Sequence, residues 1–265
     1  MKYLNDHYYL IQLQYLGFRF HGWQKQPNVK TVQEYIEKTL RFIFKHQDFK
    51  TLGGSRTDAM VSANDAYCHL ITKEFYDTNW LTKELNKNLP RDINIINIKQ
   101  VDASFDMIGA VKIKEYHYLF SHGERNHPFA APMMVGKTNT LDIDLMQQGA
   151  KLFKGKHNFK KYTKKPNPNT VCEREVFSSE IIKNDIYTAN FFPKESYIYK
   201  VTGPGFMHYQ VRMMMGSLFL LGSGEMNLET FKKTLSHWDD ELVLNEIAPA
   251  SGLILHKNTL HTQNQ

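Results

Sequence analysis

A short glycine-led segment, Gly54-Ser55-Arg56-Thr57-Asp58-Ala59, places a carboxylate two residues after a guanidinium. Such a carboxylate can act as a nucleophile or a base, although surface ion pairs and Asx-turns are commoner uses of these residues. A second arginine, Arg212, stands between Val211 and Met213 in an apolar stretch. A guanidinium in apolar surroundings needs a carboxylate partner, because a buried unpaired charge is costly. Asp58 is the candidate partner, so the residues predict an ion pair between Asp58 and Arg212.

A basic stretch between residues 151 and 165 is interleaved with aromatic side chains. Its cationic residues are Lys151, Lys154, Lys156, His157, Lys160, Lys161, Lys164 and Lys165, and its aromatic residues are Phe153, Phe159 and Tyr162. Lysines contact phosphates and rings stack on bases, so this pattern favours a nucleic-acid partner. A solvated helix end followed by a loop has the same composition, so both interpretations stay open.

Other chemistries find little support in the spacing of residues. The twelve histidines form no H-x-x-x-H or H-E-x-x-H pattern, and the two cysteines, Cys68 and Cys172, form no C-x-x-C pair. Gly203-Pro204-Gly205 and Gly222-Ser223-Gly224 complete neither a dinucleotide fingerprint nor a phosphate-binding loop. We therefore expect neither a metal site nor a cofactor.

Length and composition indicate a globular protein of one large or two modest domains. The chain has 265 residues, of which 42% are hydrophobic and 23% charged, and its formal net charge is +6. The N-terminal residues lack the apolar segment of an export signal, and no apolar run approaches the roughly 20 residues that span a bilayer. Two isolated cysteines suit a reducing compartment, so we expect a soluble protein of the cytoplasm.

Hydrophobic periodicity predicts the elements that must position these residues. In the first half we expect strands over 8–15, 66–72 and 93–101, and helices over 32–44 and 80–88, the former opened by a capping box at Thr31 and Glu34. In the second half we expect strands over 111–120, 176–182, 186–191 and 197–202, and helices over 141–153 and 208–221, the latter ending at Gly222. The similar order of the two halves suggests a duplicated β-α-β-β-α-β unit with a boundary near Ala103.

Four separated segments together resemble one known family. They are Tyr15 to Gln26 (YLGFRFHGWQKQ), Ser55 to Ala63 (SRTDAMVSA), Gly205 to Gly216 (GFMHYQVRMMMG) and Ala248 to Leu255 (APASGLIL). Their types and order are similar to those of the TruA-type family of tRNA pseudouridine synthases, and weaker matches between them extend the resemblance over nearly the whole chain.

The resemblance implies roles for particular residues. Asp58 would be the catalytic carboxylate, acting as nucleophile or base, and Arg212 its ion-pair partner. Tyr116 would pack against the base and Arg56 would grip the flipped nucleotide, while Leu253 would wall the pocket. For Tyr116 and Leu253, an ordinary cross-strand aromatic and a core leucine are equally open interpretations. The tRNA backbone would lie against Arg19, His21 and Lys25 of the first loop, and against Lys154, Lys156, Lys160 and Lys161.

The resemblance also implies a fold and an assembly. We expect an α+β protein with two ferredoxin-like halves, residues 1–103 carrying the catalytic Asp loop and residues 104–265 carrying the helix Arg and the active-site Tyr. The halves would form one extended, mainly antiparallel sheet with helices on one face and a cleft between them. The implied substrate is a uridine of tRNA, by family precedent in the anticodon stem-loop, bound by a homodimer without a cofactor.

The chain departs from the family pattern at several positions, which leaves other functions open. Leu16, Met60, Ser62 and Ile108 stand where the family has other residues, and Ile108 replaces an arginine of the expected RNA-binding surface. One alternative is a tRNA-binding protein of the same fold that lacks synthase activity. Another is a carbohydrate hydrolase using Asp58, although such enzymes usually need a second carboxylate.

Overall fold

The computed structural model describes residues 6–164, 166, 169–236 and 242–260, apart from the side chains of residues 108, 111 and 112. Its contacts divide the chain into two compact units. Unit 1 contains the described residues up to Lys112 and those from Leu255 onward, and unit 2 contains Ile113–Ile254. The division differs from the expected boundary near residue 103 in two ways. The first unit continues to Lys112, and it also includes the end of the last strand.

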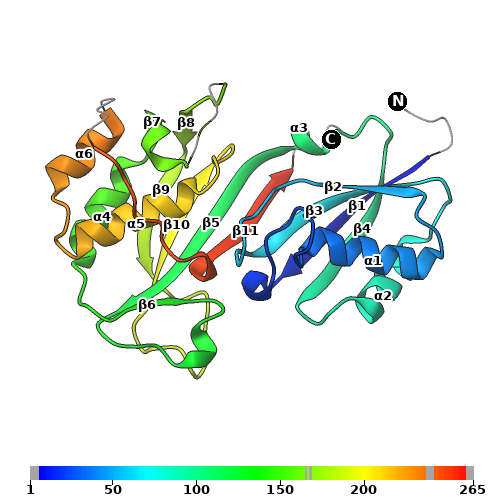
Figure 1. The fold of residues 1–265 in the computed structure, drawn as a ribbon, viewed down its shortest axis with the longest axis horizontal. Helices are drawn as coiled ribbons and strands as arrows, with labels where there is room; N and C mark the ends of the chain where they lie inside the picture. The colour runs from blue at the N-terminus through cyan, green and yellow to red at the C-terminus, as the bar shows by residue number, and fades with distance from the viewer. Residues whose placement is uncertain (1–5, 165, 167–168, 237–241, 261–265) are drawn as a thin grey trace. The chain divides into compact units, whose positions relative to one another are not determined.

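Unit 1 follows a β-α-β-β-α-β order. Its elements are β1 (His7–Tyr15), η1 (Gly17–Arg19), α1 (Val32–Phe44), β2 (Phe49–Gly53), β3 (Ser62–Thr72), α2 (Thr78–Asn88), β4 (Ile93–Val101) and α3 (Met107–Ala110). The strands pair antiparallel in the order β4-β1-β3-β2, the arrangement of a ferredoxin-like sheet. The helices α1 and α2 contact each other, and α2 contacts β4 (Figure 1).

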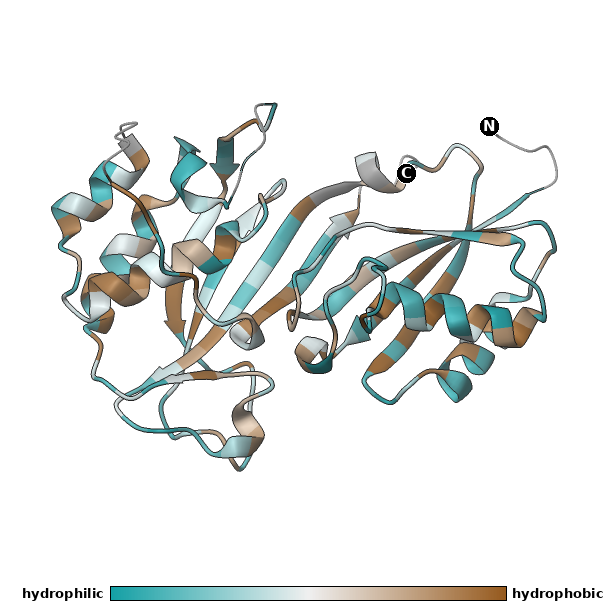
Figure 2. Ribbon diagram, viewed as in Figure 1, coloured by the Kyte–Doolittle hydropathy of each residue, from teal (hydrophilic) through white to brown (hydrophobic). Residues whose placement is uncertain are grey.

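The sequence explains why these elements form. The side chain of Thr31 accepts a hydrogen bond from the Glu34 amide at 3.3 Å, which confirms the predicted cap of α1. One face of α1 is buried through Val32, Ile36 and Leu40, and Figure 2 shows that this helix carries both hydrophobic and hydrophilic residues.

Unit 2 repeats the order with insertions. Its elements are β5 (Val111–His122), η2 (Pro128–Ala130), β6 (Val135–Lys137), α4 (Ile143–Leu152), β7 (Gly155–Asn158), η3 (Lys160–Tyr162), β8 (Glu173–Val176), β9 (Ser178–Lys183), β10 (Tyr197–Gly203), α5 (Gln210–Gly222), α6 (Leu228–Ser236), η4 (Ala250–Gly252) and β11 (Leu253–Leu260), whose end belongs to unit 1. Strands β5, β10 and β9 pair antiparallel in that order, β6 joins β5 in parallel, and β7 pairs with β8. Both units are therefore mainly antiparallel α+β structures, as predicted.

The long helix α5 is the core element of unit 2. Helices α4 and α6 pack against it, and nearly all of its residues are buried. The helix ends at Gly222, the predicted stop, although this glycine is its last helical residue and Ser223 is the C-cap. A Cβ at Gly222 would lie against the side chain of Met146, so the glycine serves close packing with α4. No helix among the described residues is long and apolar enough to cross a membrane.

The predicted strand at residues 186–191 is absent, and Asn184 explains why. The Asn184 side chain accepts a hydrogen bond from the Tyr187 amide at 2.9 Å and donates one to the Tyr187 carbonyl at 2.8 Å. These bonds fold the segment into a turn, where Tyr187 and Phe191 cover the small core around Leu119 and Ile198.

Candidate active site

The loop that joins β2 to β3 alternates between buried and outward side chains. Ser55 and Thr57 are buried, whereas Arg56 is exposed and Asp58 is half-buried. Arg56 is therefore accessible to solvent and Asp58 is partly accessible, whereas their neighbours are not. This is the presentation that a carboxylate and a guanidinium need in order to meet a substrate.

The first loop, between β1 and α1, grips this segment through its backbone. The amide of Trp23 donates to the carbonyl oxygen of Thr57 at 3.2 Å, and the amide of Met60 donates to that of Phe20 at 2.9 Å. Gly22 has φ +86°, and a Cβ there would collide with the carbonyl oxygen of Thr57. Only glycine satisfies both conditions without strain, which explains why this motif carries one at residue 22.

A buried hydroxyl pair completes the grip. Tyr15, the last residue of β1, shares a hydrogen bond of 2.9 Å between its hydroxyl and Oγ1 of Thr57. Burial raises the pKa of the Tyr15 hydroxyl, which keeps it protonated. No pattern in the sequence predicts this contact, although both residues lie in segments that match the family.

In unit 2, the structure brings the third and fourth matching segments together at Arg212. This half-buried arginine lies in the first turn of α5, and its Nε donates to the carbonyl oxygen of Ala248 at 2.8 Å. Its guanidinium carbon also lies 5.1 Å from the ring centroid of Tyr209. The role of Ala248 had no signal of its own in the sequence.

Tyr116 and Leu253 are both nearly buried in unit 2. The Tyr116 side chain, on β5, is 8% exposed, and its ring lies edge-on to Phe206 with centroids 5.4 Å apart. Leu253 is 5% exposed and opens β11. Tyr116 thus contacts the segment that precedes α5, the helix that carries Arg212.

Backbone strain marks both regions. Met60 and Tyr209 are non-glycine residues with φ of +67° and +63°. Met60 follows Asp58 closely and Tyr209 is the residue before α5, the helix of Arg212. A left-handed non-glycine residue costs about 1–2 kcal/mol, so its surroundings must hold it there.

The structure decides against base stacking for the aromatic residues between 151 and 165, one of the two interpretations left open by the sequence. Phe153, Phe159 and Tyr162 are fully buried and pack on one another, with Phe153 and Tyr162 centroids 5.3 Å apart. Burial explains this, because the three rings fill the core beneath α4 and α6, whereas the charged side chains lie at the surface. Lys154, Lys156 and Lys160 are exposed, Lys161 donates to the carbonyl oxygen of Leu242 at 2.7 Å, and Lys165 lies outside the described residues.

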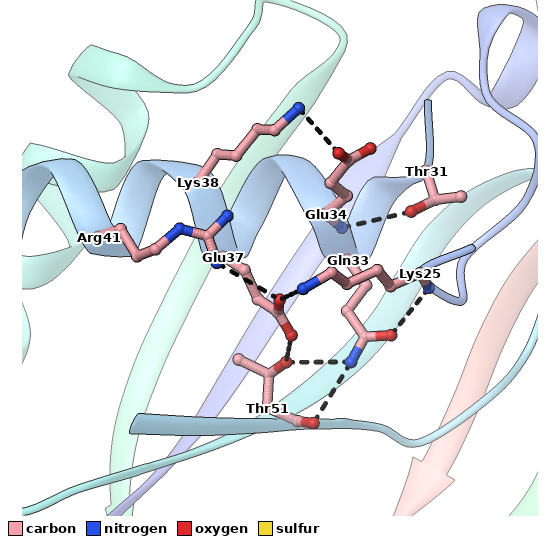
Figure 3. A network of polar contacts seen from close by, with 8 residues as sticks. All are labelled: Lys25, Thr31, Gln33, Glu34, Glu37, Lys38, Arg41 and Thr51. Atoms are coloured by element: carbon pink, nitrogen blue, oxygen red, sulfur yellow. Dashed lines mark hydrogen bonds and ion pairs between the residues drawn. The ribbon is translucent and has the colours of Figure 1, made fainter. Parts of the chain in front are cut away.

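Two cations of the first loop already have acidic partners. Arg19 forms a two-pronged ion pair with Asp92, and its Nη2 lies 2.8 Å from Oδ1. Lys25 Nζ lies 2.8 Å from Oε2 of Glu37, within the polar network of α1 and β2 in Figure 3. His21 is exposed.

The predicted site residues thus fall into two groups. Arg56 and Asp58 belong to unit 1, and Tyr116, Arg212 and Leu253 belong to unit 2. The ion pair between Asp58 and Arg212 stays a prediction.

Comparison with known proteins identifies the class of protein to which this chain belongs. The family model described as tRNA pseudouridine synthase matches residues 12–108 and 150–259. A tRNA pseudouridine synthase A of Dictyoglomus thermophilum is 34% identical over 93% of this chain and 97% of its own. One of Streptococcus agalactiae is 32% identical over 93% of each chain. A solved structure titled Cbf5-Nop10-Gar1 complex covers 78% of this chain and 46% of that one, with 15% identity and a TM-score of 0.33.

The matches include the Asp58 loop and the segment around Arg212, so the class is that of enzymes that isomerise uridine to pseudouridine in RNA. More particularly, this chain belongs to the tRNA pseudouridine synthase family. The predicted family and enzymatic activity are confirmed.

Proposed function

We propose that this enzyme modifies uridine in the anticodon stem-loop of tRNA and that Asp58 acts directly on the target nucleotide. The observation that carries the role of Asp58 is its partial exposure beside the exposed Arg56, on a loop whose neighbours Ser55 and Thr57 are buried. A carboxylate must be held in one orientation to act on a sugar or base, and the clamp by Gly22 and Trp23 supplies this.

The reaction rearranges one nucleotide without gain or loss of atoms. The bond between N1 of the base and C1′ of the sugar breaks, the base turns, and C5 joins C1′. C5 then loses its proton and N1 carries one. Asp58 begins the reaction as nucleophile at C1′ or as base on the sugar, and neither route consumes a cofactor.

The other site residues have supporting roles in this proposal. Arg212 pairs with the Asp58 carboxylate and favours its ionised form. The ring of Tyr116 packs on the base and its hydroxyl assists the proton transfer from C5. Leu253 walls the pocket, and Arg56 occupies the position that the flipped nucleotide leaves.

The basic side chains bind the tRNA backbone. Lys154, Lys156 and His21 are exposed and can meet phosphates directly, and Lys160 is exposed as well. Lys161, Arg19 and Lys25 must first exchange the partners that they hold in the free protein. We also place the enzyme in the cytoplasm as a homodimer in which one tRNA touches both subunits.

Mapping the product tests the proposed target. Purified protein is incubated with unmodified tRNA transcripts, and pseudouridine is located by chemical labelling, with the Asp58→Asn protein as a blank. We expect new pseudouridine within the anticodon stem-loop and none with the variant. Modification confined to other regions would overturn the proposed target, and modification by the variant would overturn the role of Asp58. Light scattering tests the dimer, which requires about twice the chain mass of 31.0 kDa.

A further inference from the structure

The residue directly before Asp58 has a buried side chain whose hydrogen-bond partner comes from the central strand of unit 1. Thr57 is 9% exposed and Tyr15 is 4% exposed. Their hydroxyl groups lie 2.9 Å apart, and the side chain of Thr57 forms no other hydrogen bond with the described part of the chain. The Asp58 loop is thus joined to the sheet by a side-chain bond as well as by its backbone.

Tyr15 itself is rigidly placed. It ends β1, which lies between β3 and β4, and it pairs with Ala63 on one side and Ile93 on the other. Its ring centroid lies 6.1 Å from that of Trp23, the residue whose amide holds the carbonyl oxygen of Thr57. The bond to Thr57 therefore transmits the position of the sheet to the loop.

We propose that the Tyr15 hydroxyl is a positioning group for catalysis, which orients Asp58 by holding the side chain of Thr57. This inference rests on the proposed role of Asp58. A rotation about the backbone of Thr57 would swing the adjacent carboxylate, and displacements of about 1 Å at a reacting group can reduce rates about 100-fold. Neither hydroxyl touches the substrate in this proposal.

A matched pair of buried tyrosines separates positioning from general stability. Tyr199 in unit 2 is also fully buried, and its hydroxyl shares a hydrogen bond of 3.1 Å with Oγ of Ser179. Tyr15→Phe and Tyr199→Phe each remove one buried hydroxyl and leave one hydroxyl partner without its bond. A structural role alone predicts similar consequences for both variants.

The experiment measures the single-turnover rate of pseudouridine formation at saturating enzyme, the Kd for tRNA and the Tm. We expect Tyr15→Phe to be about 10- to 100-fold slower than the wild type, with a Kd within about twofold, and Tyr199→Phe to be within about twofold in rate. Thr57→Val should be as slow as Tyr15→Phe, and Thr57→Ser, which keeps the hydroxyl, should restore the rate. The double variant Tyr15→Phe/Thr57→Val should be no slower than either single one, because both act on the same bond.

Equal rates for Tyr15→Phe and Tyr199→Phe, beside an inactive Asp58→Asn, would overturn the positioning role and leave the proposed function intact. An active Asp58→Asn would instead overturn the proposed function. Should Tyr15→Phe fail to fold, the comparison of Thr57→Val with Thr57→Ser decides: equal rates in that pair would overturn the inference.

Discussion

Arg212 and Ala248 hold each other by two hydrogen bonds. Nε of Arg212 donates to the carbonyl oxygen of Ala248 at 2.8 Å, and the amide of Ala248 donates to the carbonyl oxygen of Arg212 at 3.1 Å. The bond at Nε fixes the plane of the guanidinium. The two terminal amino groups carry its other N–H donors and share its positive charge.

Arg212→Lys should keep the charge but lose this fixed orientation, since lysine has no donor at the Nε position. We expect the single-turnover rate to fall about 100-fold. Arg41→Lys in α1, whose side chain lies 3.9 Å from Glu37, is the control and should change the rate less than twofold. Equal rates for wild type and Arg212→Lys would show that orientation of this arginine is unimportant.

Gly22→Ala should destabilise unit 1 and distort the Asp58 loop. A positive φ costs an alanine about 1 kcal/mol, and the collision with the Thr57 carbonyl should add about 1–3 kcal/mol. Gly123 has φ +90° with open space around it, so Gly123→Ala isolates the first contribution. Urea unfolding of both variants measures the difference, and equal losses would contradict the close approach.

Lys154→Ala and Lys156→Ala should weaken tRNA binding and make it less sensitive to salt. Each phosphate contact contributes about one to the slope of log Kd against log salt concentration, so each variant should lower this slope by about one. Lys87→Ala on α2, whose side chain is 72% exposed, serves as the control. If Lys154→Ala and Lys156→Ala leave the slope unchanged, as the control does, the basic stretch is not part of the tRNA-binding surface.

Asp92→Asn should increase the affinity for tRNA. The variant frees Arg19 from its ion pair and removes a negative charge beside the proposed path of the RNA. We expect a few-fold lower Kd at low salt, and no gain when Arg19→Gln is combined with it. Asp48→Asn, an exposed aspartate elsewhere in unit 1, controls for net charge. A gain that survives Arg19→Gln would exclude Arg19 as its source.

Stability should fall in mild acid because of His69. Burial lowers the pKa of this histidine on β3, whose Nε2 is buried. The unfolded chain therefore binds a proton at a higher pH than the folded one, with a pKa of about 6.5. The free energy of unfolding is thus highest above that pH, and it decreases as the pH falls toward the pKa of the folded state. His69→Phe should flatten this decrease in denaturant titrations between about pH 7 and 5, and an unchanged profile would contradict it.

Periodic segments were predictable because local patterns determine them. The strand β4 has its expected bounds, and α1 begins at the expected cap. The strand β2, which pairs with β3, was missed because a short strand with half-exposed residues has no strong pattern of its own. Helix α6 was also missed, and the turn at Asn184 replaced an expected strand.

The site was predictable only as separate segments. The resemblance identified the loop of Asp58 and the helix of Arg212. No spacing in the sequence predicts the contact of Tyr15 with Thr57 or that of Ala248 with Arg212. Such contacts join residues far apart in the chain, and only the folded backbone brings them together.

The rate of pseudouridine formation by Asp58→Asn measures the catalytic role of this carboxylate, because the change removes one charge and preserves the shape of the side chain. We expect a fall of about 10⁴-fold or more in the single-turnover rate, with the Kd for tRNA within about twofold of the wild type. A variant that forms pseudouridine at the wild-type rate would contradict this role.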